Sequence, residues 1–202
     1  VLLDEIEKAH PSIFDKFLQI LEDGRMTDGQ GNTVYFSETL IIFTSKLGIT
    51  QQYIDANGRE RREQLVFPSE TYEEIEPKVL SAIKDHFKPE VLNRIGNNII
   101  VYDFIRPEAS RAIVKGQVSK INARIAKQNK ITIHVPEDVL EFYYGLANHD
   151  SVLEMGGRGI GNLMEDRYIN PLAEFIFEAD CKEGERVNVV LDHDNVKFVK
   201  GE

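Results

Sequence analysis

Two adjacent acids near the start of the chain could carry out phosphoryl-transfer chemistry. Asp4 and Glu5 come directly after Val1-Leu2-Leu3, an apolar run typical of a buried strand. At the end of such a strand, one carboxylate can order the water around Mg²⁺ while the next polarises an attacking water. The same two acids could instead form a solvated helix N-terminus, where the helix dipole favours negative charge. The pair alone leaves both interpretations open.

The other residue types that commonly bind metals favour no further site. The lone Cys181 can complete neither a zinc site nor an intramolecular disulfide, and it fits a reducing compartment. The histidines are scattered without the spacing of metal ligands: His10, His86, His134, His149 and His193. Four aromatic residues are expected in the core rather than in a cofactor site: Tyr143, Tyr144, Phe175 and Phe177. We therefore expect no metal other than Mg²⁺.

The acidic pair needs a sheet and flanking helices to position it, and the apolar pattern predicts both. Strands are predicted at the start of the chain and at two later apolar runs, residues 39–44 and 98–102. We expect these three strands to lie in one parallel sheet. The other predictions for this half are a helix from Ser12 to Gly24, a turn-rich hairpin over 23–33, a polar surface segment over 51–63 with a solvated helical face at 59–63, and a helix over 75–86.

A change of character at Arg106-Pro107-Glu108 predicts a domain boundary, with one domain over residues 1–105 and a second over 106–202. The second begins with a long helix whose inner face repeats at helical spacing. That face is formed by Ile113, Val114, Val118, Ile121 and Ile125. The elements predicted after it are a strand at 131–135, a helix from Pro136, a glycine-rich turn at 156–161, a helix to about Glu178 and two strands. This order predicts a compact mixed α/β unit.

The composition disfavours several classes of protein. The 202 residues are 42% hydrophobic, so the chain can bury a real core. With 34 acidic and 24 basic residues, the formal charge is −10, which disfavours nucleic acid and anionic membranes as partners. No apolar run approaches the roughly 20 residues that a membrane helix needs. We therefore expect a cytoplasmic protein. Because the chain starts directly in a strand, we also expect further strands to precede it in the intact protein.

Five stretches spread over the chain carry a family resemblance. They are VLLDEIEKAH from residue 1, LQILEDGRMTDGQGNTV from 18, LIIFTSKLG from 40, FKPEVLNRIG from 87 and GGRGIGNLMEDRYINPLAEFI from 156. Together they resemble the second ATPase module of Clp-type AAA+ unfoldases and disaggregases. The resemblance implies an α/β fold, in which an incomplete AAA+ P-loop NTPase core, a parallel sheet with flanking helices, is followed by a small mixed α/β C-terminal subdomain. The chain would begin inside the Walker B strand and lack the phosphate-binding loop.

The resemblance also implies roles for single residues in the binding and hydrolysis of ATP with Mg²⁺. Asp4 would hold Mg²⁺ through water, and Glu5 would activate the hydrolytic water. Arg94 matches the arginine finger that reaches the ATP of a neighbouring subunit, and Arg158 matches the sensor-2 arginine of the small subdomain. Lys46 stands at sensor 1, where its charge could bind phosphate. Either arginine could otherwise be an ordinary surface or helix-capping residue.

Three positions depart from the family pattern. Lys46 follows Thr-Ser where the family has Asn, and lysine brings a charge without an acceptor that could orient water. Gly96 stands where an acid is usual. The motif around Arg158 reads Gly-Gly-Arg-Gly rather than Gly-Ala-Arg-Pro. Lys46 and Gly96 motivate one alternative function, a degenerate assembly or scaffold module that does not hydrolyse ATP.

The leading hypothesis from the resemblance is an ATP-dependent protein unfoldase or remodelling chaperone. The parent protein would form a ring of identical subunits, expected to be a hexamer, and would pull protein substrates through a pore faced by the hairpin DGRMTDGQG. The chain by itself is expected to be inactive. The ATPase subunit of a Clp protease is a further alternative, with a protease or an adaptor as partner. The lack of an Ile-Gly-Phe tripeptide between Ile49 and His86 favours the remodelling chaperone.

Overall fold

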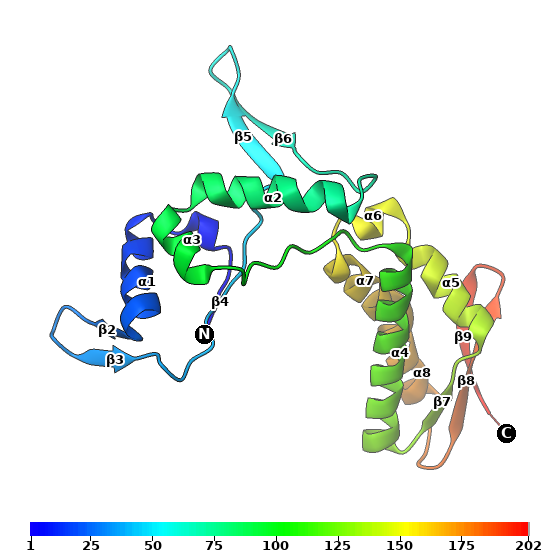
Figure 1. The fold of residues 1–202 in the computed structure, drawn as a ribbon. Helices are drawn as coiled ribbons and strands as arrows, with labels where there is room; N and C mark the ends of the chain where they lie inside the picture. The colour runs from blue at the N-terminus through cyan, green and yellow to red at the C-terminus, as the bar shows by residue number, and fades with distance from the viewer. Residues whose placement is uncertain (202) are drawn as a thin grey trace. The chain divides into compact units, whose positions relative to one another are not determined.

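The computed structural model of the protein describes residues 1–201, which divide into two compact units after Asp103 (Figure 1). Each unit has its own cluster of buried apolar side chains. None of the described helices is both long and apolar enough to span a membrane.

The first unit consists of short strands and helices. In chain order its elements are β1 (Leu2–Leu3), the 3₁₀ turn η1 (Ile6–Lys8), α1 (Ser12–Asp23), β2 (Arg25–Thr27), β3 (Thr33–Tyr35), β4 (Ile42–Phe43), β5 (Thr50–Ile54), β6 (Glu60–Gln64), α2 (Tyr72–His86) and α3 (Pro89–Ile95). β1 and β4 are parallel neighbours, with Leu2 opposite Ile42 and Leu3 opposite Phe43. The predicted parallel pairing of the first two strands is therefore confirmed. β2–β3 and β5–β6 are antiparallel hairpins.

Helix α1 is fixed at its end and on one face by its sequence. Gly24 adopts a left-handed conformation with φ 64°, and its N–H donates to a carbonyl of the last turn, which ends the helix as predicted. Phe14 is buried together with Ile6 and Val91. Phe87 packs edge-on against Phe14 with 5.1 Å between the ring centroids. This small core joins α1 to η1 and α3.

Two predictions for the first unit are wrong. Residues 98–102 form no strand, because no strand lies beside them in the described chain to complete a hydrogen-bonded ladder. The polar segment that was predicted to carry a helical face at residues 59–63 forms the hairpin β5–β6 instead. Every strand residue of this hairpin is exposed, so its strands lack the alternation of apolar and polar residues by which a strand is predicted.

The second unit combines helices with a three-stranded sheet. Its elements are α4 (Pro107–Asn129), β7 (Thr132–His134), α5 (Glu137–Ala147), α6 (Asp150–Leu153), α7 (Gly157–Met164), the π-helical turn η2 (Glu165–Ile169), α8 (Asn170–Glu178), β8 (Arg186–Asp192) and β9 (Asn195–Lys200). β8 lies in the middle of the sheet, parallel to β7 and antiparallel to β9. The predicted mixed α/β unit is confirmed.

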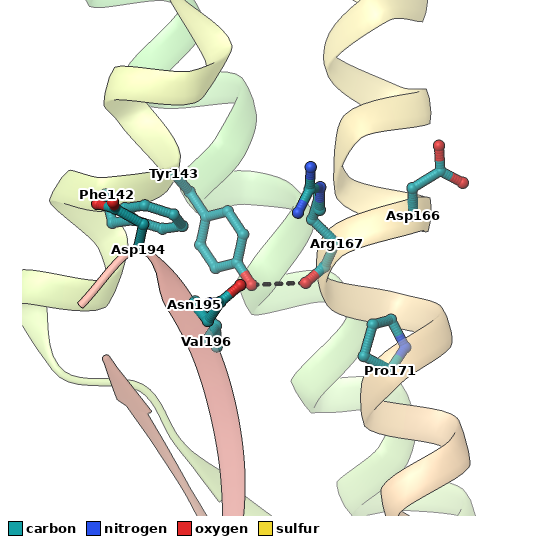
Figure 2. Close-up of a pocket in the computed structure, with 8 residues that line it drawn as sticks. All are labelled: Phe142, Tyr143, Asp166, Arg167, Pro171, Asp194, Asn195 and Val196. Carbon is teal, nitrogen blue, oxygen red and sulfur yellow. Dashed lines mark hydrogen bonds between the residues drawn. The ribbon is translucent and has the colours of Figure 1, made fainter. Parts of the chain in front are cut away.

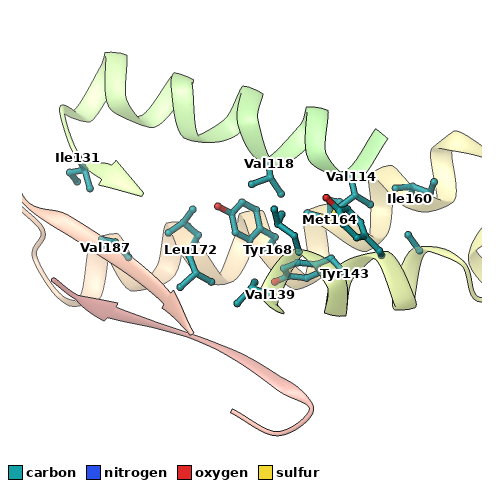
Figure 3. Packing of buried hydrophobic residues seen from close by; sticks show 14 residues of the cluster. Val114, Val118, Ile131, Val139, Tyr143, Ile160, Met164, Tyr168, Leu172 and Val187 are labelled. Atoms are coloured by element: carbon teal, nitrogen blue, oxygen red, sulfur yellow. The ribbon is translucent and has the colours of Figure 1, made fainter. Parts of the chain in front are cut away.

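The core of the second unit draws on its helices and its sheet (Figure 3). The buried side chains labelled there are Val114, Val118, Ile131, Val139, Tyr143, Ile160, Met164, Tyr168, Leu172 and Val187. Val114 and Val118 belong to the predicted inner face of α4. Burial raises the pKa of Tyr168 to about 12. The prediction of four aromatic core residues is wrong for Phe177, whose side chain is 86% exposed.

The glycine-rich stretch predicted as a turn is the beginning of α7. Within it only Gly156 has a positive φ, 62°, and the helix starts at the next residue. Gly159 has a packing role, since a Cβ at this position would lie 2.0 Å from the carbonyl oxygen of Val152. α7 therefore approaches the backbone of α6 more closely than any side chain would permit.

A cavity of about 240 Å³ is lined by residues of α5, η2, α8, the start of β9 and the turn before it (Figure 2). Inside it the hydroxyl of Tyr143 donates to the backbone carbonyl of Arg167 at 2.8 Å. This bond satisfies the polar end of a fully buried aromatic ring. None of the predicted site residues lines the cavity.

Candidate functional site

The parallel strands β1 and β4 end at the same edge of their sheet and bring the predicted acids there. Asp4 follows β1 and Thr44 follows β4, and the Thr44 hydroxyl donates to Asp4 Oδ1. The same hydroxyl oxygen accepts from the N–H of Glu5 at 3.1 Å. The Ile6 N–H donates to the Thr44 carbonyl at 3.0 Å, which extends the backbone contact past the strand. Thr44 thus joins the two acids.

Glu5 has an unusual backbone conformation for a residue with a side chain. Its φ of 52° and ψ of 50° lie in the left-handed region, which most residues other than glycine avoid. Such a conformation costs of the order of 1–3 kcal/mol and persists only where neighbouring contacts enforce it. Here the bonds from Glu5 and Ile6 to Thr44 do so. Strained residues of this kind cluster at functional sites.

Two lysines hold the Glu5 carboxylate. Lys46 Nζ pairs with Oε1, and Lys8 Nζ pairs with Oε2. The hydrogen bond from Lys46, followed by that from Lys8, lowers the pKa of Glu5 to about 2. Glu5 in turn raises the pKa of Lys8. Glu5 is therefore an ionised carboxylate at neutral pH, with both of its oxygens already in ion pairs.

Glu7 supports the Lys46 backbone from the 3₁₀ turn η1. Its Oε1 accepts from the N–H of Lys46 at 3.2 Å. Its other oxygen, Oε2, is buried and has no hydrogen-bond partner among the described residues. The segment that follows β4 is thereby tied to the turn that follows β1, which keeps Lys46 close to Glu5.

The oxygen donors at this edge of the sheet fit Mg²⁺ that is bound through water. Mg²⁺ prefers hard oxygen ligands and commonly keeps several waters beside one or two carboxylates. Asp4 offers a carboxylate and Thr44 a hydroxyl, while Lys46 adds a cation suited to a phosphate. In the described chain no group of three or more His, Cys, Asp or Glu residues gathers as a metal site. The oxygens of Asp4 and Thr44 are thus compatible with Mg²⁺ held through water.

Arg94 makes its ion pair elsewhere in the first unit. It lies in the last turn of α3 and pairs with Glu22 in the last turn of α1. The distances to Glu22 Oε1 are 3.1 Å from Nε and 2.9 Å from a terminal guanidinium nitrogen. Gly96 follows with φ 61° and ψ −135°, a conformation that favours glycine and accounts for its presence where the family pattern has an acid.

The structure therefore brings together three of the five predicted site residues: Asp4, Glu5 and Lys46. Arg158 belongs to the second unit, where it is exposed in the first turn of α7. Sequence reasoning assigned no role to Thr44, although it closes the second apolar run and so had to lie at the carboxyl end of a strand. It also missed Glu22, whose pairing with a residue 72 positions away has no local signal.

Two family models match the chain. The AAA domain (Cdc48 subfamily) matches residues 1–98, and the C-terminal, D2-small domain of ClpB protein matches residues 105–189. Chaperone protein ClpB 1 of Thermosynechococcus vestitus is 36% identical over 194 residues, 96% of this chain and 21% of that protein. Chaperone protein ClpB of Rhizobium meliloti is 34% identical over 201 residues, 100% of this chain and again 21% of the relative.

The structure is also similar to a solved one, that of the S. cerevisiae Hsp104:casein complex in its extended conformation. The TM-score is 0.74 at 31% sequence identity, over 100% of this chain and 32% of that chain. The chain spans about a fifth of the length of the curated relatives it matches. These matches confirm the predicted family and fold class. The chain belongs to the Clp family of AAA+ ATPases, in which it corresponds to the C-terminal part of the second ATPase module.

Proposed function

We propose that this chain is the water-activating and nucleotide-sensing part of an ATP-dependent chaperone that remodels or disaggregates other proteins. The observation that carries the proposal is the acidic pair Asp4-Glu5 at the carboxyl edge of two parallel strands, joined by Thr44. The names of the relatives, which are chaperone proteins, support the choice of a remodelling function.

The proposed division of labour follows the predicted domains. Residues 1–105 form the C-terminal part of the AAA+ large subdomain with Walker B, sensor 1 and the arginine finger, and residues 106–202 form the small subdomain with sensor 2. The intact protein is proposed to be a cytoplasmic ring, a hexamer, that acts on protein substrates. The solved relative bound to casein supports a polypeptide as the substrate.

In the proposed site each residue has one task. Asp4 orients the water around Mg²⁺, and Glu5 orients the water that attacks the terminal phosphate. Mg²⁺ neutralises charge on the phosphates of ATP when it is bound. Lys46 contacts the terminal phosphate, and Arg158 senses it from the small subdomain. Arg94 of one subunit stabilises the charge that develops on the ATP of the neighbouring subunit.

The experiment compares Glu5→Gln with the unmodified full-length protein that contains this chain. We expect phosphate release to fall by about a hundredfold or more, because an amide cannot accept the proton of the attacking water. Binding of a fluorescent ADP analogue should stay unchanged, and reactivation of a heat-aggregated reporter enzyme should be lost. Glu38→Gln, at an exposed acid, is the matched control. Unchanged phosphate release by Glu5→Gln would contradict the proposal.

The 202-residue chain alone has no Gly-x-x-x-x-Gly-Lys-Ser/Thr loop to hold the phosphates, so it should release no phosphate from ATP.

A second candidate function is a nucleotide-binding assembly module that hydrolyses ATP slowly or not at all. The specific observation in its favour is that Lys8 and Lys46 occupy both oxygens of Glu5. Phosphate release by the unmodified full-length protein distinguishes the two candidates. If the protein is an assembly module, it should bind the ADP analogue tightly but release phosphate no faster than the Glu5→Gln variant does. The protease-coupled alternative stays disfavoured by the lack of an Ile-Gly-Phe tripeptide.

A further inference from the structure

The proposed arginine finger is held by a carboxylate of its own subunit. Glu22 Oε1 accepts from Nε of Arg94 at 3.1 Å and pairs with one terminal guanidinium nitrogen at 2.9 Å. Both side chains are about half exposed, 51% for Arg94 and 46% for Glu22. The ion pair therefore lies at the surface of the first unit, within reach of a second molecule.

The docking of α3 on α1 does not depend on this ion pair. Phe14 and Val91 are buried between the two helices, and Phe87 packs edge-on against Phe14. A second exposed ion pair, from Lys88 Nζ to Asp15 Oδ1 at 2.7 Å, links the residue before α3 to α1 about two turns nearer the start of α1. Ion pairs this exposed add little to stability, because water screens them. Glu22 is thus free to serve another purpose.

The geometry of the pair suits an arginine that must be aimed. Glu22 engages the side of the guanidinium formed by Nε and one terminal nitrogen, so the far edge keeps its remaining N–H donors open. A planar guanidinium held along one side cannot rotate freely, and its open edge then faces in a fixed direction. A cation that is fixed before the reaction stabilises developing charge without a cost of reorganisation.

From this geometry we infer that Glu22 is a positioning residue for Arg94, which it orients so that the open guanidinium edge meets a phosphate on a neighbouring copy of the chain. The inference rests on the proposed function, in which Arg94 acts on the ATP of the next subunit. Glu22 itself touches no reacting group.

The experiment measures ATP hydrolysis by Glu22→Gln in the full-length protein. We expect kcat to fall about tenfold with KM within about twofold, because a loosely held group loses catalytic power rather than substrate affinity. Asp15→Asn removes the ion pair between α1 and Lys88, the residue before α3, and should leave both constants unchanged. Glu22→Asp keeps the charge and should recover part of the loss. In an Arg94→Ala background, Glu22→Gln should have no further effect, since the group it positions is gone.

A chemical readout without nucleotide tests the orientation directly. Phenylglyoxal modifies free guanidinium groups, and its rate at Arg94 can be followed by mass spectrometry of the peptide that contains the residue. Glu22→Gln should raise this rate severalfold, while Asp15→Asn should not.

The outcomes separate the inference from the proposed function. If Arg94→Ala leaves hydrolysis unchanged, the proposed finger is wrong and the inference falls with it. If Arg94→Ala abolishes hydrolysis while Glu22→Gln matches the unmodified protein, only the positioning role is overturned. An increase in kcat for Glu22→Gln would also overturn it, because Glu22 would then restrain Arg94 rather than aim it.

Discussion

Lys46 places an ammonium group on the carboxylate that is proposed to activate water. In the family pattern this position carries Asn, whose amide can hold a water without claiming a carboxylate oxygen. Here the ion pair with Glu5, together with Lys8, lowers the pKa of that acid to about 2. A carboxylate so strongly stabilised in its ionised form is a weaker base than an unpaired one. Of the three positions that depart from the family pattern, Lys46 is therefore the one that contacts the proposed catalytic group.

Lys46→Asn in the full-length protein should therefore speed ATP hydrolysis. We expect about a tenfold rise in kcat, part of the factor that general-base catalysis commonly contributes. Continuous phosphate-release assays at saturating ATP measure it. Lys16→Asn, which removes an exposed lysine from α1, is the control for the change in net charge. Slower hydrolysis by Lys46→Asn would contradict the prediction, because the phosphate contact proposed for Lys46 would then outweigh the effect of its ion pair with Glu5.

Among the elements of the second unit, α7 owes its position to a missing side chain. The carbonyl oxygen of Val152 lies only 2.0 Å from where a Cβ on Gly159 would stand, and the Met155 Cβ lies 3.0 Å from it. The first of these neighbours is backbone, which cannot move aside without shifting α6. Gly159, the last residue of Gly-Gly-Arg-Gly, is thus required for close packing as well as being part of a departure from the family pattern.

Gly159→Ala should destabilise the chain by about 1–3 kcal/mol, the usual cost of overpacking a well-filled contact. Gly161→Ala in the same helix is the matched control. The nearest atom to its new methyl group, Gln117 Nε2, would lie 3.9 Å away, and alanine favours a helix over glycine. Urea denaturation followed by circular dichroism gives both free energies of unfolding. Equal midpoints for the two variants would show that the backbone of α6 moves aside without cost.

At the scale of the whole molecule, the proposed site is complete only when two subunits meet. Glu5 and Arg94 lie in the same unit but pair with different partners, Lys46 and Glu22. The proposal assigns them to opposite sides of one interface in a ring. Loss of a trans-acting arginine costs about a thousandfold or more in related phosphoryl-transfer systems.

Rings mixed from Arg94→Ala and Glu5→Gln subunits should therefore hydrolyse ATP, although rings of either variant alone should not. Mixing creates some interfaces at which the intact Glu5 of one subunit faces the intact Arg94 of the next. Phosphate release is measured across mixing ratios, with subunit exchange monitored by native mass spectrometry. If hetero-rings form and no hydrolysis returns, Arg94 does not act in trans.

The sequence by itself determined the family and most helices, and it singled out Asp4 and Glu5 as candidate site residues. Helix α1 could be bounded because Ser12 and Gly24 carry the signals of a helix start and stop, and α4 because its apolar residues repeat at helical spacing. The motifs around Asp4 and Arg94 located the candidate site residues, since residues in a motif keep their spacing whatever the rest of the chain does.

Only the tertiary structure decided which partners these residues have. Lys46 meets Glu5 across 41 positions and Arg94 meets Glu22 across 72, and no local pattern encodes such contacts. Distant contacts also decided which segments form strands. Residues 98–102 are apolar enough for a strand but have no neighbouring strand in the described chain. The polar residues of β5 and β6, in contrast, pair with each other. A strand exists only through its partner, so hydrogen bonding between distant segments, and not local composition, fixed these assignments.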